Sequence, residues 1–441
     1  MMDLLRNRTY RHLFAAQVIA LIGTGLATVA LGLLAYELAG ADAGTVLGTA
    51  LAIKMVAYVG VAPVAAALAQ GLPRRALLVS LDLVRAAVAL ALPFVAQVWH
   101  VYVLIFLLQA ASAAFTPTFQ ATIPDVLTDE KDYTRALSLS RLAYDMESLV
   151  SPMLAAALLT VVSFHDLFAG TVFGFLASAL LVVLVVLPPS APQLRRSIYE
   201  RTVRGMRIYL ATPRLRGLLA VNAAVAAAGA MVFVNTVVMV QSGFGLTQSA
   251  VAAALAAFGA GSMLAALALP KMLERWQDRT VMLTGIAALV VLLLLGAAGL
   301  DYRGLLGLWF VAGLAYATAQ TPSGRLLRRS SHPADRPALF AAQFALSHAC
   351  WLVFYPLAGW MGAGWGMPAT FVVLALAALF ATALAIAVWP VHDPDVIEHE
   401  HATQDSGQAH GPCGIPTDLG IRHAHTFWID DQHKHWPQAA N

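Results

Sequence analysis

Long apolar runs alternate with short polar segments through the first 390 residues of the chain. A run of about 20 apolar residues is what a helix needs to cross the roughly 30 Å hydrocarbon core of a bilayer. Twelve runs meet this requirement: His12–Tyr36, Val46–Ala69, Ala76–Val98, Val101–Gln120, Leu137–Val162, Leu167–Leu187, Leu215–Gln241, Ala250–Leu269, Val281–Leu300, Leu305–Gln320, Ala338–Met361 and Met367–Trp389. The pattern predicts an all-α polytopic membrane protein with twelve transmembrane helices.

Lysine and arginine residues gather in alternate loops. The N-terminus, the loops after spans two, four, eight and ten, and the polar segment 188–216 carry nearly all of them, whereas the opposite loops carry only Arg303. Segment 188–216 alone holds seven arginines, at positions 195, 196, 201, 204, 207, 214 and 216. Because positive charge is retained on the cytoplasmic side, both termini and this segment are predicted to be cytoplasmic, in a bacterial inner membrane.

Composition narrows the class further. Hydrophobic residues make up 59% of the 441 residues and charged residues only 12%, with a mean hydropathy of +0.72, which excludes a soluble domain. The two cysteines, Cys350 and Cys413, are too few for a disulfide framework. The basic residues follow the topology, so no nucleic-acid partner is expected. The chain lacks a phosphate-binding loop of the Gly-x-x-x-x-Gly-Lys-[Ser/Thr] type, so we expect neither an ATP-driven pump nor an enzyme, and no cofactor.

The two halves of the chain share sequence features at a nearly constant offset. Thr116-Pro117 recurs as Thr321-Pro322, Ala136-Leu137 as Ala338-Leu339, and Pro152 as Pro356. These matches suggest a duplicated six-helix unit, and the two prolines are expected to serve helix packing. The predicted division is an N-terminal half at 1–187, a central loop at 188–216, a C-terminal half at 217–390 and a tail at 391–441. Parallel repeats of this kind are one transporter plan, with the substrate site at the repeat interface.

Two further stretches point to a family. Leu68-Ala69-Gln70-Gly71-Leu72-Pro73-Arg74-Arg75 follows span two, and Ser151-Pro152-Met153-Leu154-Ala155-Ala156 lies in span five. With two six-helix halves and a basic central loop, these positions resemble the major facilitator superfamily over about residues 5–390. Gln70 and Gly71 stand where that family usually has an acidic residue and an arginine. The resemblance implies transport by alternating access, with the spans packed closely where small residues replace the glycines of span five.

Ionisable residues inside the bilayer are costly and are functional candidates. Lys54 has no neighbour in its own span to neutralise it, so it requires an acid from another helix or water. Glu147 lies about 200° around the helix from Asp145, so the two carboxylates do not share a face. Asp145 is expected either to pair with Arg141, four residues earlier, or to serve transport.

Other polar residues of the spans have both structural and functional interpretations. His348 is either a hydrogen-bonded packing residue or a proton carrier or metal ligand. Asp82 and Arg85, three residues apart, are expected to pair with each other. The family resemblance places further polar residues along the cavity, namely Gln17, Thr24, Gln109, Asn222, Asn235 and Gln320.

The tail after Trp389-Pro390 differs in kind from the rest of the chain. It is hydrophilic, is predicted to lack regular structure, and holds eight of the thirteen histidines. In an extended chain, residues i and i+2 point to the same side, so each His-x-His pair presents two imidazoles to one ion. The predicted metal ligands are His399, His401, His410, Cys413, His423, His425, His433 and His435. The apolar centre of residues 423–431 suggests that part of the tail docks on the transporter.

A facilitator core with a histidine-rich tail resembles the bacterial nickel-resistance exporters of this superfamily. The resemblance implies proton-coupled export of Ni²⁺, with Co²⁺ as a second ion, and capture that weakens as pH falls. The alternative is an exporter of an organic compound, such as a drug or siderophore, in which the tail is incidental. A metal sensor that transports nothing is a third interpretation, which the twelve spans and Lys54 disfavour. The expected partners are the lipid bilayer, the substrate and protons.

The predicted topology can be tested by labelling. A cysteine introduced at Gln193, in the central loop, is expected to be inaccessible to a membrane-impermeant thiol reagent added outside the cell, because the lysine and arginine bias places this loop in the cytoplasm. Labelling is measured in intact cells and, as the positive control, in permeabilised cells. Modification in intact cells would show that the orientation is inverted.

Overall fold

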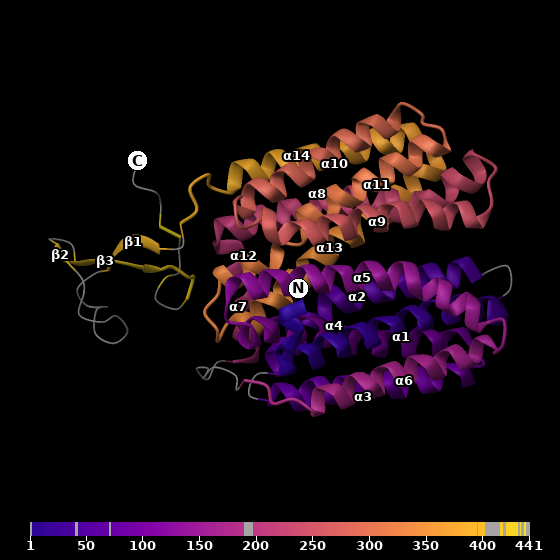
Figure 1. Cartoon of the computed structure of the whole chain (residues 1–441), viewed down its shortest axis with the longest axis horizontal. Helices are drawn as coiled ribbons and strands as arrows, with labels where there is room; N and C mark the ends of the chain where they lie inside the picture. Colours follow the sequence, from indigo (N-terminus) through magenta and orange to yellow (C-terminus); the bar gives the residue numbers. More distant parts are fainter. Residues whose placement is uncertain are drawn as a thin grey trace.

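The computed structural model describes residues 2–39, 43–69, 72–188, 197–394, 396–401, 415–417, 420–430, 433 and 436–437. Two helical bundles lie side by side, with the N-terminal helices in one and the C-terminal helices in the other (Figure 1). A small β-sheet projects beyond one end of the helices (Figure 1). This arrangement confirms the predicted fold class.

Six long helices form the N-terminal bundle. A 3-10 helix η1, Met2–Arg6, precedes them, and a short η3, Leu92–Phe94, follows the third. The long helices are α1 (Arg8–Ala39), α2 (Ala43–Leu68), α3 (Arg74–Ala91), α4 (Val98–Val126), α5 (Glu130–Leu158) and α6 (Phe164–Val183).

The C-terminal bundle repeats this plan. Its six long helices are α8 (Pro213–Val237), α9 (Gln248–Met272), α10 (Asp278–Ala297), α11 (Tyr302–Gln320), α13 (Arg336–Gly364) and α14 (Met367–Val388). A π-helical segment η4, Val238–Gly243, extends α8, and a short α12, Ser323–Arg329, follows α11.

The same helix pairs pack in both bundles. In the N-terminal bundle α1 packs on α5 and α6, α3 on α4 and α6, and α2 on α4. The C-terminal bundle has the equivalent pairs, with α8 on α13 and α14, α10 on α11 and α14, and α9 on α11. The repeated pairing confirms the duplicated six-helix unit. Pro152 and Pro356, the matched prolines, lie inside α5 and α13.

Nine helices within the described ranges are long and apolar enough to cross a membrane by length and composition. Of the other three long helices, α5 carries the most charge. It begins at Glu130, seven residues before the expected start at Leu137, because the Asp129 side chain accepts a hydrogen bond from the backbone N–H of Asp132 at 3.0 Å and caps the helix. An apolar run predicts only the part of a helix that lies in the membrane. It gives no sign that the helix continues into a polar segment.

The central loop contains a helix that hydropathy did not reveal. This helix, α7 (Ile198–Ala211), begins with a reciprocal cap between Ser197 and Glu200. It packs against α13 and α2. Arg204 holds it to Asp335, before α13, through hydrogen bonds of 2.5 and 2.8 Å. The loop is therefore attached to the C-terminal bundle and also reaches the N-terminal one.

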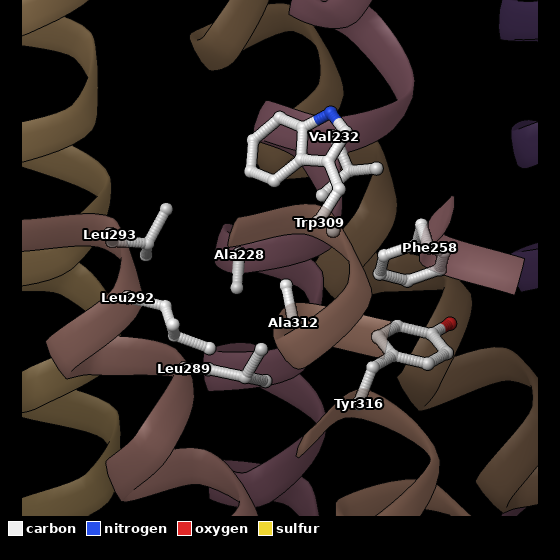
Figure 2. Close-up of a pocket in the computed structure, with 10 residues that line it drawn as sticks. Ala228, Val232, Phe258, Leu289, Leu292, Leu293, Trp309, Ala312 and Tyr316 are labelled. Carbon is white, nitrogen blue, oxygen red and sulfur yellow. The ribbon is translucent and has the colours of Figure 1, made fainter. Parts of the chain in front are cut away.

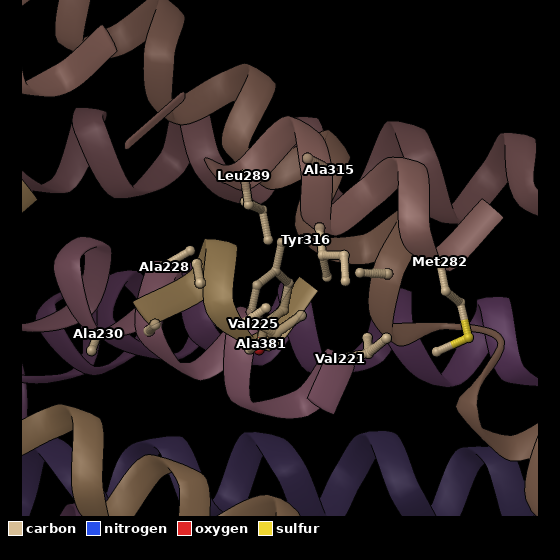
Figure 3. Close-up of a cluster of buried hydrophobic side chains, with 14 of the residues drawn as sticks. Val221, Val225, Ala228, Ala230, Met282, Leu289, Ala315, Tyr316 and Ala381 are labelled. Atoms are coloured by element: carbon tan, nitrogen blue, oxygen red, sulfur yellow. The ribbon is translucent and has the colours of Figure 1, made fainter. Parts of the chain in front are cut away.

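The core of the C-terminal bundle surrounds α8. Figure 3 shows Val221, Val225 and Ala228 of α8 among side chains of α10, α11 and α14, such as Met282 and Ala381. Small residues dominate α8, which lets its neighbours approach closely. This packing makes the bundle a continuous apolar body.

The arginine-rich end is the end of the bundles where α2, α4, α9 and α11 finish and α3, α5, α10 and α13 begin. The β-sheet lies beyond it and consists of β1 (Val396–His401), β2 (Ile415–Thr417) and β3 (Gly420–Thr426), all antiparallel in the order β1-β3-β2. The tail was expected to lack regular structure, and this expectation was wrong for these strands. Backbone hydrogen bonds between the strands form this sheet, although the sequence of the tail lacks the apolar pattern that predicts a strand.

Paired glycines bring α9 and α11 into close contact. A Cβ atom at Gly313 of α11 would lie 1.9 Å from the carbonyl oxygen of Phe258 in α9, and one at Gly261 of α9 would lie 1.9 Å from that of Phe310 in α11. Only glycine permits this approach of two backbones.

The glycine contact predicts a difference between two positions of one helix. Gly313→Ala is expected to lower the free energy of unfolding by about 1–3 kcal/mol, because its methyl group meets a backbone oxygen that cannot move aside. Gly307→Ala in the same helix faces open space and is expected to be neutral or stabilising. Thermal unfolding of the purified proteins measures both, and equal midpoints would contradict the prediction.

Candidate functional site

A cluster of aromatic and basic side chains joins the two bundles between α2 and α13. The Lys54 ammonium lies 5.5 Å from the ring centroid of Tyr58, within range of a cation–π interaction. The Tyr58 ring meets His348 of α13 edge-on at 4.7 Å and Phe344 at 4.8 Å. Nδ1 of His348 lies 2.7 Å from the carbonyl oxygen of Phe344. A carbonyl only accepts, so Nδ1 carries the proton and Nε2 is left as the acceptor of a neutral ring.

An acid of α5 lies within electrostatic range of Lys54. Glu147 interacts electrostatically with Lys54, as does His348. Glu147 also lies beside α1, where a Cβ atom at Gly25 would be 3.7 Å from its Cγ. Charges interact strongly where water is scarce. The structure therefore brings together three of the predicted site residues, two from the N-terminal half and one from the C-terminal half.

Asp145 takes part in a different contact between the halves. Its carboxylate pairs with Arg141 at 2.5 Å, as the i, i+4 spacing predicted. Arg141 in turn donates to the hydroxyl of Ser262 in α9 at 3.1 Å and lies 4.7 Å from the ring centroid of Tyr316 in α11. Asp145 is thus the counter-charge of an arginine that spans the interface. It points away from Glu147, as the helix geometry required.

The predicted Asp82–Arg85 pair is present and is internal to the N-terminal half. Ser178 of α6 donates a hydrogen bond to Asp82 at 2.8 Å, and Arg85 bonds to the same carboxylate. The guanidinium of Arg85 lies between the rings of Phe115 and Phe175, at 4.0 and 4.5 Å. This arrangement ties α3, α4 and α6 together.

The other predicted polar positions contact neighbouring helices or their own backbone. Gln17 of α1 accepts a hydrogen bond from Ser140 of α5 at 3.0 Å, and Asn235 of α8 donates to the carbonyl of Ala358 in α13 at 3.1 Å. Asn222 is buried in α8. Thr24, Gln109 and Gln320 are partly buried. Of the paired prolines, Pro356 has an exposed ring, and the side chain of Pro152 lies outside the described residues.

A small apolar cavity lies within the C-terminal half. Figure 2 shows Trp309, Phe258, Tyr316 and Leu289 around it. Its volume is about 10 Å³, about the space that a single water molecule needs. It is too small for a substrate, so it is not a candidate site.

The arginine-rich end carries a second set of contacts between the halves. The Tyr133 hydroxyl donates to the carbonyl of Gly324 at 3.2 Å, and Glu130 pairs with Arg325 at 2.6 Å. Asp125, at the end of α4, pairs both with Arg336 of α13 and with Arg74 of α3. Together these contacts close this end.

Sequence reasoning missed this closure. It treated the basic residues of these loops only as a topology signal, and it did not single out Asp125 or Tyr133. The recurrence of Thr-Pro near the ends of spans four and ten could have marked the two segments, because each copy precedes one of these contacts, Asp125 in the first half and Gly324 in the second.

Comparison with known proteins settles the family. The sequence model of the Major Facilitator Superfamily matches residues 13–234 and 218–430. These two segments cover nearly the whole chain. The chain belongs to the Major Facilitator Superfamily. The usual acidic and arginine positions of its loop motif, here Gln70 and Gly71, lie outside the described residues. The adjacent Arg74 bridges to α4 through Asp125.

Solved structures share this superfamily fold at low sequence identity. A human organic anion transporter covers 86% of this chain and 99% of its own, with a TM-score of 0.73 and 13% identity. The Escherichia coli fucose:proton symporter covers 87% and 98%, with a TM-score of 0.67 and 15% identity. A bacterial homologue of the iron transporter ferroportin, in its outward-facing state, covers 86% and 98%, with a TM-score of 0.73 and 12% identity. These likenesses show the fold alone.

Two curated relatives are efflux proteins. Macrolide efflux protein A of Streptococcus pyogenes is 26% identical over 214 residues, 47% of this chain and 52% of the relative. The protein of the same name from Enterococcus faecalis is 26% identical over 185 residues, 40% and 57% of the two chains. The chain thus spans about half the length of the curated relatives it matches.

The tail docks on the C-terminal half of this superfamily fold. Phe427 and Ile429 are buried in the same core as Trp389. The indole N–H of Trp428 donates to the carbonyl of Arg329 at 3.2 Å. The Trp436 ring lies 5.1 Å from the guanidinium of Arg214. The structure thus agrees with the expectation that part of the tail docks on the transporter.

The predicted metal ligands of the tail fall into three groups. His433 is buried, and its Nδ1 lies 3.0 Å from the Asp430 carboxylate. The strand register places His399 opposite His423, and the same two strands contain His401 and His425. His410, Cys413 and His435 lie outside the described residues. Within the described part of the chain, no group of three or more His, Cys, Asp or Glu residues is placed to hold a metal ion.

The Lys54–Glu147 interaction predicts coupled effects of substitution. Lys54→Ala is expected to reduce transport at least about tenfold and to lower stability, because it leaves Glu147 with a partly buried charge and no counter-charge. Lys54→Arg is expected to restore transport only in part, since arginine does not readily lose its proton. The double variant Lys54→Ala/Glu147→Gln is expected to regain stability but not transport.

Transport and thermal unfolding are both measured in reconstituted protein, with Lys271→Ala, at an exposed lysine of α9, as the matched control. Normal transport by the Lys54→Ala variant would show that Lys54 has only a packing role. Additive losses of stability in the double variant would show that the two charges do not interact.

Proposed function

We propose that this protein is a secondary transporter that exports an amphipathic organic compound in exchange for protons. The observation that carries the proposal is the cluster of Lys54, Glu147 and His348 between the two halves. It offers titratable groups for coupling beside the aromatic surface of Tyr58 and Phe344, which suits an organic substrate. The relatives named as macrolide efflux proteins support the same substrate class.

The proposed cycle is alternating access, with the arginine-rich end and both termini facing the cytoplasm. In the present state that end is closed by Tyr133, Glu130 and Asp125, each bonded to the C-terminal half. Opening toward the cytoplasm requires these contacts to break together, while each bundle moves as one body. Protonation of Glu147 removes a negative charge near Lys54 and so changes the electrostatics of the cluster between α2 and α13.

Export of Ni²⁺ is the second candidate function. One observation favours it, the pairing of β1 with β3, which places His399 opposite His423 in two strands that also contain His401 and His425. The membrane path offers little to support it, because His348 is the one histidine of the inter-half cluster and its companions are aromatic. Borderline metal ions favour sites with several imidazole, thiolate or carboxylate ligands.

Everted membrane vesicles distinguish the two functions. With an imposed proton gradient, the full-length protein is expected to accumulate a macrolide or a lipophilic cationic dye several-fold over vesicles without it. The accumulation is expected to collapse when a protonophore is added, and Glu147→Gln vesicles are expected to lack it. Ni²⁺ uptake, measured in the same vesicles, is expected to equal the background.

Proton-driven uptake of Ni²⁺ without uptake of the organic probes would overturn the proposal in favour of metal export. A chain truncated after Pro390 extends the comparison to the tail. Loss of Ni²⁺ uptake on truncation would assign the metal function to the histidines of the ribbon.

A further inference from the structure

A polar cavity of about 220 Å³ lies at the arginine-rich end, where the two halves and the tail meet. Its walls come from three parts of the chain that are distant in sequence. Tyr133 belongs to α5 of the N-terminal half, Arg328 and Arg329 to α12, Arg336 to α13, and Trp428 to the docked tail. The proposed transport cycle uses the closure of this end but gives no role to the cavity itself.

Most of the arginines around the cavity have carboxylate partners. Arg325 pairs with Glu130 at 2.6 Å and with Asp278 at 3.1 Å. Arg329 shares Asp278 at 3.3 Å. Arg336 pairs with Asp125, which also pairs with Arg74. Asp278 and Asp125 are each shared between two arginines, and Asp393, which lies 4.0 Å from Arg329, also pairs with Arg214. Together with Arg328, these arginines outnumber the carboxylates that face them.

Arg328 differs from these residues. One of its terminal nitrogens, Nη2, donates to the carbonyl of Thr128, and its guanidinium lies 5.2 Å from the ring centroid of Tyr133. The other, Nη1, is buried and has no hydrogen-bond partner among the described residues. Burial, and the positive charge of Arg336, lower the pKa of Arg328 from its ordinary value. A buried donor of a charged group without an acceptor is costly.

A phosphate group would satisfy these requirements. Its oxygens accept hydrogen bonds from the planar guanidinium two at a time, and such charge-assisted bonds are the strong ones. Its negative charge would balance the excess positive charge around Arg328. We propose that this cavity binds a phosphate-bearing anion, which bridges the two halves and the tail and stabilises the closed arginine-rich end. The phosphate comes either from a free anion or from an acidic lipid headgroup, because the cavity lies at the ends of membrane helices.

The experiment measures thermal unfolding of the purified full-length protein, which does not depend on the transported substrate. Inorganic phosphate is titrated at constant ionic strength, with chloride as the reference anion, into protein held in phosphatidylcholine nanodiscs. A second arm replaces part of the lipid with phosphatidylglycerol. Binding to the folded state raises the unfolding midpoint as the ligand concentration increases.

The wild type is expected to be stabilised by phosphate or by phosphatidylglycerol, and the arm that responds identifies the source. Arg328→Gln is expected to weaken the response at least about tenfold, as the loss of a hydrogen bond between charged groups implies. Arg328→Lys keeps the charge but loses the planar donors, so a few-fold weaker response is expected. Arg275→Gln removes an exposed arginine at the same end of the bundles and is expected to respond as the wild type does.

Two results would overturn the inference. One is a wild type that responds to neither probe. The other is an equal response of the wild type, Arg328→Gln and Arg328→Lys, which would place the anion elsewhere. Should Arg328→Gln fail to fold, as judged by gel filtration, the comparison of Arg328→Lys with the wild type decides the matter.

Discussion

The free-energy cost of placing a charged side chain away from water determines the helix contacts of this molecule more than any other constraint. Each ionisable side chain discussed within its spans has an interaction partner, and the partner's position determines which helices meet. Asp82 and Arg85 neutralise each other inside the N-terminal half. Arg141 is neutralised by Asp145 but reaches across to the C-terminal half. Lys54 finds its acid on another helix. These partners divide the charges into those that hold one bundle together and those that join the two bundles.

The two kinds of contact suit a protein made of two moving bodies. Inside the bundles, helices meet through glycine and alanine, as Gly313 and Gly261 do, and such packing has one arrangement. Between the bundles, polar and aromatic contacts are added to small apolar ones, such as those of Ala62 and Ala113 with Phe344. The Tyr133 hydrogen bond and the Asp125–Arg336 ion pair can break at modest cost when water enters. A transporter whose halves rock around a central site requires this division.

The docked tail adds a third body to the arginine-rich end. Phe427 and Ile429 belong to the core of the C-terminal half, so part of the tail is packed into the folded transporter. Trp428 is hydrogen bonded to Arg329, in the same α12 as the arginines that contact the N-terminal half. This hydrogen bond joins the docked tail to the short helix that contacts the N-terminal half. For the histidine-rich ribbon beyond it, the strand register is the only observation that relates to function.

The sequence by itself determined the fold class, the number of long helices in the two bundles, the duplication and the local pairs Asp82–Arg85 and Arg141–Asp145, because apolar length and i, i+3 or i, i+4 spacing are properties of single helices. It also showed that Lys54 needed an acid from another helix or water. Only the tertiary structure decided that Glu147 lies within electrostatic range of Lys54, that Asp125 joins Arg74 to Arg336, and that α7 packs against both bundles. Those contacts join residues far apart in the chain, and their formation depends on how whole helices pack, which no local pattern encodes.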